Sequence, residues 1–171
     1  MELRHAEWTD LERILEIYAA ARKFMAEHGN PTQWGITFPP REYVEEDIRF
    51  GRNYVCEEDG KVCAVFFYKV HDTDDDPDYP GIFDGSWLAP RPYGVVHRIA
   101  SDGSVKGAGA FCIETAYSWL PNLRIDTHPD NVVMQNLLTK LGFTKCGKII
   151  YGGDGTLRYA YQKTEEVKEQ E

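Results

Sequence analysis

Apolar residues recur along the chain with a helical period in some stretches and with the period of a strand in others. Over residues 10–28 they return every three or four positions, which predicts a helix ended by the Gly-Asn-Pro that follows. Thr9 and Glu12 stand at the spacing of a capping box near its start. A shorter pattern over residues 40–51 predicts a second helix. Its expected apolar contacts are Tyr43, Val44, Ile48 and Phe50.

Residues 53–70 indicate a β-hairpin. The dipeptide Asp59-Gly60 suits a two-residue turn between β-branched and aromatic runs, and the second arm is apolar on both faces, as in a central strand. An even register places Cys56 and Cys63 opposite each other across the hairpin. Two reduced core thiols are expected there rather than a strained disulfide.

The other elements alternate in a regular order. A strand over residues 2–6 precedes the first helix, and a loop over residues 71–92, rich in Asp, Pro and Gly, follows the hairpin. We expect its acidic run 72–78 to be solvated. The remaining predictions are a strand at 93–100, a helix at 107–119, a strand at 123–127, a helix at 129–142 that Gly142 caps, and a closing hairpin at 143–163.

This order predicts a single α/β (α+β) domain over residues 1–163, followed by a polar tail over residues 164–171. The hairpins are antiparallel, and the fourth and fifth strands, which a helix connects, are parallel. The sheet is therefore expected to be mixed, mostly antiparallel, with about seven strands.

Composition narrows the partners. The net charge of −9 repels nucleic acid and anionic membranes and mildly favours a cationic substrate such as an amine. No apolar run is long enough to cross a bilayer, and the opening MELRHAEW is charged where a secretory signal is apolar, so a cytoplasmic protein is expected. The four cysteines form no C-x-x-C pair, so no zinc site or other metal site is expected.

One short stretch, DGSVKGAGAF over residues 102–111, combines glycines with a lysine at the start of a predicted helix. Gly107 and Gly109 allow close approach of the backbone, and a helix amino terminus offers unpaired N–H groups to an anion such as pyrophosphate. Lys106 adds a positive charge. The stretch matches neither the Walker motif nor G-x-G-x-x-G, and an ordinary glycine-rich helix start fits it equally well.

The order of elements over residues 2–163 resembles the GNAT N-acetyltransferase superfamily. Three passages carry the resemblance. SVKGAGA is similar to the acetyl-coenzyme A pyrophosphate loop of that family, with Ser104 where Gln or Arg is usual. HPDNVVMQNLLTKLGF is similar to the helix after the fifth strand, with Asn131 at the usual asparagine, and GKIIYGGDGTLRYAYQK is similar to the terminal hairpin.

The resemblance implies about four helices on both faces of the sheet and direct transfer of an acetyl group from acetyl-coenzyme A to an amine. The parallel strands would splay and hold the pantetheine arm in the gap, where a backbone N–H would polarise the thioester carbonyl. The implied cofactor contacts are Ile99, Ala100, Ser101, Val105, Lys106, Gly107, Ala108, Gly109, Ala110 and Asn131.

The reaction needs a base and an acid. His97, Asp126 and His128 are the candidate catalytic residues, and Glu114 is expected to face solvent or a neighbouring helix. A hydrogen-bonded core role for His97, and helix capping by Asp126 and His128, are open alternatives. Many family members have a tyrosine seven residues after the asparagine. Leu138 stands there in this chain, which leaves Tyr151 or water to protonate the thiolate.

Substrate contacts are expected from two segments. Asn30, Gln33 and Trp34 lie between the first two helices, and Asp84 and Trp87 lie in the long loop. Core packing of the tryptophans and a turn role for Asp84 are the alternatives.

These features favour an N-acetyltransferase that acts on a small-molecule amine or a protein N-terminus. A non-catalytic acyl-coenzyme A-binding or regulatory module, and a phosphate-binding domain for another nucleotide, are the alternatives. Association through exposed strands is common in this fold, so the resemblance suggests a homodimer.

Overall fold

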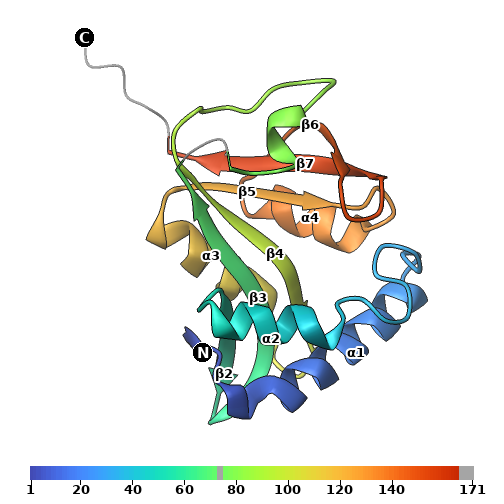
Figure 1. Cartoon of the computed structure of the whole chain (residues 1–171), viewed down its shortest axis with the longest axis vertical. Helices are drawn as coiled ribbons and strands as arrows, with labels where there is room; N and C mark the ends of the chain where they lie inside the picture. The colour runs from blue at the N-terminus through green and yellow to red at the C-terminus, as the bar shows by residue number, and fades with distance from the viewer. Residues whose placement is uncertain (73–74, 166–171) are drawn as a thin grey trace.

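A computed structural model describes residues 1–72 and 75–165 and shows one mixed sheet with helices on both faces (Figure 1). The strands are β1 (Glu2–His5), β2 (Asn53–Glu58), β3 (Lys61–His71), β4 (Tyr93–Ser101), β5 (Asn122–Thr127), β6 (Thr144–Tyr151) and β7 (Thr156–Thr164). The helices are α1 (Leu11–Glu27), α2 (Arg41–Arg49), α3 (Ala108–Trp119) and α4 (Val132–Lys140), with 3₁₀ turns η1 (Trp8–Asp10) and η2 (Tyr79–Gly81). The predicted fold class is confirmed.

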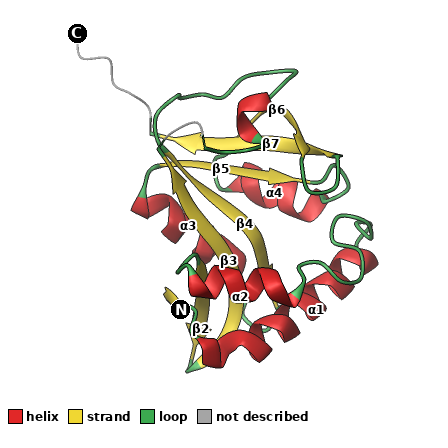
Figure 2. Ribbon diagram, in the orientation of Figure 1, coloured by secondary structure: helices red, strands yellow, loops and turns green. Residues whose placement is uncertain are grey.

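The sheet has seven strands in the order β1-β2-β3-β4-β5-β7-β6. Only β4 and β5 are parallel, and they pair at only two positions, Gly94 with Leu123 and Val95 with Arg124. Beyond these positions the two strands diverge, as Figure 2 shows. The predicted splay is therefore confirmed.

Each face of the sheet carries its own apolar core. Helices α3 and α4 cover one face, where Ile113 and Leu138 pack in the same cluster as Phe66 of β3. Helices α1 and α2 cover the other face, where Ile14 packs in the cluster that contains Val65. Because neighbouring residues of a strand point to opposite faces, β3 had to be apolar on both, as a central strand is.

The register of the β2–β3 hairpin corrects the predicted pairing of its cysteines. The turn lies at Asp59-Gly60 as expected, but Glu57 pairs with Val62 and Cys56 then pairs with Ala64. Cys63 is the extra residue of a β-bulge, so it does not face Cys56 directly. Both thiols are free and buried, and the Cys63 Sγ donates to the Cys56 carbonyl oxygen at 3.5 Å.

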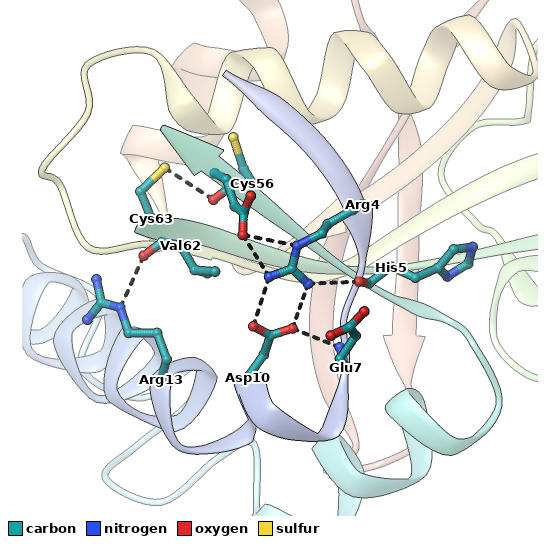
Figure 3. A network of polar contacts seen from close by, with 9 residues as sticks. Arg4, His5, Glu7, Asp10, Arg13, Cys56, Val62 and Cys63 are labelled. Carbon is teal, nitrogen blue, oxygen red and sulfur yellow. Dashed lines mark hydrogen bonds and ion pairs between the residues drawn. The ribbon is translucent and has the colours of Figure 1, made fainter. Parts of the chain in front are cut away.

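The start of the first helix also differs from the prediction. A turn of 3₁₀ helix, η1, precedes α1, and the Asp10 carboxylate accepts the Glu7 N–H at 2.8 Å, so no capping box forms between Thr9 and Glu12. Arg4 of β1 holds the same carboxylate with two bonds of 2.7 and 2.9 Å (Figure 3). It also reaches Glu57 of β2 at 2.8 Å. One arginine thus ties the edge of the sheet to the start of α1.

The long loop is folded onto the sheet, which corrects the expectation of a solvated acidic run at Asp76, while Asp72 and Asp75 are exposed as expected. Asp76 is 8% exposed and accepts the Tyr93 hydroxyl at 2.8 Å. Tyr79 is 1% exposed and packs with Tyr93 and Ile149 over β4, β6 and β7. The loop therefore covers the half of this face that α1 and α2 leave open. Residues 73–74 of the run lie outside the described residues.

Strand β7 runs to Thr164, and the Glu165 N–H donates to the Pro121 carbonyl oxygen at 3.2 Å. The first two residues of the predicted tail therefore belong to the fold, and residues 166–171 lie outside the described part. In that part no helix is long and apolar enough to span a bilayer, and no group of three metal-ligating side chains occurs.

The Arg4–Asp10 contact predicts a pH-dependent loss of stability. Hydrogen bonds from Arg4 lower the pKa of Asp10, so this stabilisation is complete above the ordinary carboxyl pKa of about 4 and is lost as the pH falls through the lowered value. Asp10→Asn should reduce the free energy of unfolding by about 1.5–3 kcal/mol at pH 7, measured by urea titration.

The deficit should shrink when the titration is repeated at pH 3, because the wild-type carboxyl is then protonated in a growing fraction of molecules. Glu16→Gln is the control, since the Glu16 carboxylate is 68% exposed beside Arg13 and contributes at most about 1 kcal/mol. Equal deficits for Asp10→Asn at both pH values would contradict the assignment.

Candidate active site

The divergence of β4 and β5 opens a cavity of about 940 Å³ between them. Val96, which packs in the α3–α4 core, and Ala100, which packs in the α1–α2 core, both line it, so the cavity reaches both faces of the sheet. At one end lie the start of α3 and the part of α4 around Leu137, while the start of α4 reaches toward the other end, where Asn131 contacts Gln33. At the other end lie the segment between α1 and α2 and the turn between β6 and β7.

The glycine stretch forms a backbone cradle at the α3 end. Gly107 is the residue before the first turn of α3 and has a φ of +79°, a left-handed conformation that favours glycine. A Cβ added there meets no atom within 4 Å, so the space beside it is open. The N–H groups of Gly109 and Ala110 have no acceptor in residues 1–72 and 75–165, as expected for the first turn of a helix.

Charges around the cradle suit an anion. Lys106 and Lys140 both line this end of the cavity, and the positive end of the α3 dipole adds to their field. The Ser104 hydroxyl and N–H both donate to the Asp102 carboxylate, at 2.6 and 3.0 Å, and Arg13 of α1 forms an ion pair with Asp102. Ser104 therefore shapes the loop, and the groups left to hold a pyrophosphate are backbone N–H groups and lysines.

A second bulge lies in β4 where the strand leaves β5. Val65 pairs with Ala100 and Phe67 pairs with His97, so two residues of β4 oppose one of β3. Arg98 lies in this bulge with a φ of +49°, and its carbonyl oxygen accepts the Tyr18 hydroxyl at 2.8 Å. Ile99, Ala100 and Ser101 line the cavity, and no β5 residue pairs with them.

The structure brings two of the candidate catalytic residues together. His97 of β4 and Asp126 of β5 both line the cavity, with His97 Nδ1 3.6 Å from Asp126 Oδ1. The His97 side chain is 32% exposed and that of Asp126 is 11% exposed. Burial lowers the pKa of His97, and the Asp126 carboxylate counteracts part of this effect. The lowered pKa favours the neutral form of His97, which a general base requires.

His128 lies outside the residues that line the cavity. Its Nδ1 accepts the Asp130 N–H at 3.0 Å in the turn before α4, where Asn131 Oδ1 accepts the Met134 N–H at 3.1 Å. His128 therefore holds the turn before α4, and Asn131 rather than His128 or Asp126 caps the helix. Glu114 is exposed on α3, where it was expected.

The segment before α2 closes the cavity with a chain of amides. Gln33 Oε1 accepts the side-chain N–H of Asn30 at 2.9 Å and that of Asn131 at 3.1 Å, which links this segment to the start of α4. Asn30 is 3% exposed, and within the described residues its Oδ1 has no partner. Trp34 lines the cavity while its ring meets Tyr18 edge-on at 5.6 Å. All three predicted residues of this segment therefore reach the cavity.

The structure does not bring Asp84 and Trp87 to the cavity, which corrects their predicted place. Asp84 has a φ of +52° in a turn beside Gly85 and forms an ion pair of 3.2 Å with Lys148. Trp87 donates its Nε1–H to the Tyr79 carbonyl oxygen at 2.9 Å, and the Arg124 guanidinium lies 4.2 Å from its ring centre. Both belong to the packing of the long loop on the sheet.

Sequence reasoning missed Arg98 and Tyr79. Arg98 Nη2 forms an ion pair of 2.6 Å with Asp47 of α2 at the wall of the cavity, and its guanidinium lies over the Phe67 ring at 4.8 Å. Tyr79 donates its hydroxyl to Asp126 Oδ1 at 2.7 Å. No local motif marks either residue, because each acts through a partner about fifty positions away.

The sequence matches no protein-family model and no curated protein. Its structure is similar to that of a GNAT-family acetyltransferase from Streptococcus agalactiae, with 31% identity over 96% of this chain and 95% of that chain and a TM-score of 0.82. The chain belongs to the GNAT acetyltransferase family. The structure is also similar to that of a GNAT-family acetyltransferase from Listeria monocytogenes. That protein is 23% identical over 95% of this chain and 93% of that chain, with a TM-score of 0.67.

A ribosomal-protein-alanine N-acetyltransferase from Brucella melitensis has the same fold, with 22% identity over 96% of this chain and all of that chain and a TM-score of 0.59. In the present GNAT protein, SVKGAGA forms the cradle, HPDN leads into α4, and GKIIYGGDGTLRYAYQK forms most of the β6–β7 hairpin, whose turn borders the cavity. The three passages behind the resemblance therefore surround one cavity.

The cradle predicts opposite effects for two glycine substitutions. Gly107→Ala should lower the free energy of unfolding by about 1–2 kcal/mol, because alanine resists a left-handed backbone. Gly109→Ala should leave it unchanged or raise it by up to about 1 kcal/mol, since a Cβ there meets only Leu137 Cδ2 at 3.8 Å inside a helix. Thermal unfolding measures both. Equal changes in the two variants would show that the loop conformation is not as described.

Proposed function

We propose that this protein is an N-acetyltransferase that moves an acetyl group from acetyl-coenzyme A directly to a primary amine. One observation carries the proposal: a single cavity joins the anion cradle at the start of α3 to the His97–Asp126 pair. A phosphate-binding domain for another nucleotide is disfavoured, because it would need no gap between β4 and β5.

The residues at the α3 end fit the coenzyme. Backbone N–H groups from Val105 to Ala110 would hold its pyrophosphate, with Lys106 and Lys140 as counter-charges. The backbone of Ile99–Ser101, which has no partner on β5, would bind the pantetheine arm, and Asn131 stands where α4 begins. When bound, acetyl-coenzyme A supplies an acyl thioester, whose carbonyl carbon is open to attack and whose thiolate is a good leaving group.

The residues at the other end provide the base. His97 Nδ1 faces the Asp126 carboxylate, so Nε2 is the nitrogen left to take the proton of an attacking amine. The carboxylate then stabilises the imidazolium. Backbone N–H groups of β4 beyond Val95 have no partner on β5 and are the available donors to a carbonyl oxygen that gains negative charge.

The acid is the second role to fill. Leu138 is fully buried in the core beneath α4 and does not line the cavity, so this position provides no proton. Tyr151 does line the cavity, and burial raises its pKa, so its hydroxyl stays protonated at neutral pH. We assign protonation of the thiolate to Tyr151 or to water.

The acceptor would enter between the α1–α2 segment and the β6–β7 turn. Asn30, Gln33 and Trp34 offer amides and an aromatic wall, which suit a primary amine of a small molecule or of a protein N-terminus. Among the structural relatives, the Brucella melitensis protein is named for a protein substrate, a ribosomal-protein alanine. The proposed partners are the coenzyme, this amine and a second copy of the chain in a homodimer.

Leu138 favours one alternative, a non-catalytic acyl-coenzyme A-binding module, because the usual acid is absent from the position where the family resemblance places it. Two measurements distinguish the N-acetyltransferase from the non-catalytic module. Acetyl-coenzyme A at 100 times its dissociation constant should stabilise the fold by about 2.7 kcal/mol in thermal unfolding, whereas adenosine should not. Thiol release should then appear with members of an amine panel. Stabilisation without thiol release would favour the module, and no stabilisation would reject both.

His97→Gln should lower kcat/KM for the amine by about 10²–10⁴, because the base is removed, while stabilisation by acetyl-coenzyme A persists. In the wild type, kcat/KM should fall on the acid side of a pKa below the ordinary histidine value of about 6.5, since burial lowers the pKa of His97.

His5→Gln on β1, outside the cavity, is the control and should retain wild-type activity. Thiol release measured from pH 5 to 9 checks both the loss and the acid limb. A loss confined to His128→Gln would contradict the assignment of His97.

A further inference from the structure

Tyr79 connects the long loop to the carboxylate beside His97. Its hydroxyl donates to Asp126 Oδ1 at 2.7 Å, and this same oxygen lies 3.6 Å from His97 Nδ1. The Tyr79 ring also meets the His97 ring edge-on, with 5.9 Å between their centres and 62° between their planes. The three side chains come from η2, β5 and β4, and they form one contiguous group.

The Tyr79 hydroxyl is held in place by a buried loop core. The backbone N–H of Tyr79 donates to Asp76 Oδ1 at 3.1 Å, and the backbone carbonyl oxygen of Tyr79 accepts the Trp87 Nε1–H at 2.9 Å. Its ring stacks on Tyr93 at 6.3 Å, and Tyr93 donates its own hydroxyl to Asp76. With 1% of its surface exposed, Tyr79 has no room to turn away from Asp126.

The tyrosine can only donate to this carboxylate. Burial first, and then the Asp126 charge, raise the pKa of Tyr79 well above its ordinary value, so the hydroxyl keeps its proton. The charged and titratable groups that face His97 are Asp126 from β5, Arg98 from β4, Asp76 from the loop and His71 from β3. Asp126 is the largest of these influences and the one that Tyr79 contacts.

We propose that Tyr79 is a positioning residue, whose hydroxyl fixes the Asp126 carboxylate against Nδ1 of His97 and so presents Nε2 of His97 to the acceptor amine. The inference rests on the proposed function. The amine nitrogen bonds to the acyl carbon, the carbon–sulfur bond breaks, and the amine proton passes to His97 Nε2. Tyr151 or water protonates the thiolate, and Tyr79 exchanges no proton in the reaction.

Tyr79→Phe and Tyr93→Phe form a matched pair, because each removes one buried tyrosine–aspartate hydrogen bond of 2.7–2.8 Å from the same loop. Tyr79→Phe should reduce kcat/KM by roughly 10- to 100-fold through misplacement of the pair. Its acid limb should move to higher pH, since Asp126 without its donor attracts the His97 proton more strongly. Tyr93→Phe should lower the unfolding midpoint in a similar way but shift the acid limb less, because Asp76, which loses its donor there, influences His97 less than Asp126 does.

A titration of the His97 ring by NMR without any substrate gives a second readout. The pKa of His97 should rise in Tyr79→Phe and fall in Asp126→Asn, which removes the charge itself. If Tyr79→Phe does not fold, Asp126→Asn still measures how strongly the Asp126 carboxylate controls the pKa of His97. An unchanged His97 titration in a folded Tyr79→Phe variant, or in Asp126→Asn, would overturn the proposal, as would equal losses of activity in the two tyrosine variants.

The outcomes also separate this inference from the proposed function. A wild type that binds acetyl-coenzyme A and acetylates no amine rejects the proposed function, while the NMR titration still decides whether Tyr79 controls His97. An active wild type whose acid limb is the same in Tyr79→Phe rejects the role of Tyr79 alone.

Discussion

The short parallel contact between β4 and β5 is the constraint on which the site depends. Two register pairs join the strands, and everything beyond Val95 and Arg124 is free of that ladder. A buried polar clamp secures the contact, because Asn122 donates to the Pro92 carbonyl oxygen at 3.1 Å and accepts the Gln162 side-chain N–H at 2.6 Å. With the strands held together only there, the bulge at Arg98 turns β4 away and opens the cavity that contains His97 and Asp126.

The open half of the sheet needs a cover, and the long loop provides it. Helices pack over β2, β3 and part of β4, whereas Tyr79, Ile82 and Trp87 pack over β6, β7 and the start of β4. The aromatic residue that stabilises this cover is also the one that reaches Asp126. The same residue therefore packs the loop on the sheet and contacts the carboxylate beside the proposed base, so the loop does more than connect β3 to β4.

The sequence predicted the features that local patterns carry and missed those that depend on distant partners. Apolar periods gave the element order, and the family resemblance gave the splay and the place of the cradle. The run DTDDDPD suggested solvated loop, since nothing local reveals that Asp76 meets the Tyr93 hydroxyl. The bulge at Cys63 was equally hidden, because a hairpin turn alone does not determine whether a ladder shifts one residue later.

Charge is distributed unevenly along the cavity, against a chain whose net charge is −9. Lys106, Lys140 and the start of α3 are positive at one end. At the other end Arg98 is paired with Asp47 and Arg158 with Asp154, whereas Asp126 lies beside His97 and the Tyr79 hydroxyl and has no arginine partner among the described residues. If the proposed function holds, the anionic coenzyme and the cationic amine would be attracted to opposite ends, and the field of the protein would orient them toward each other across the gap between β4 and β5.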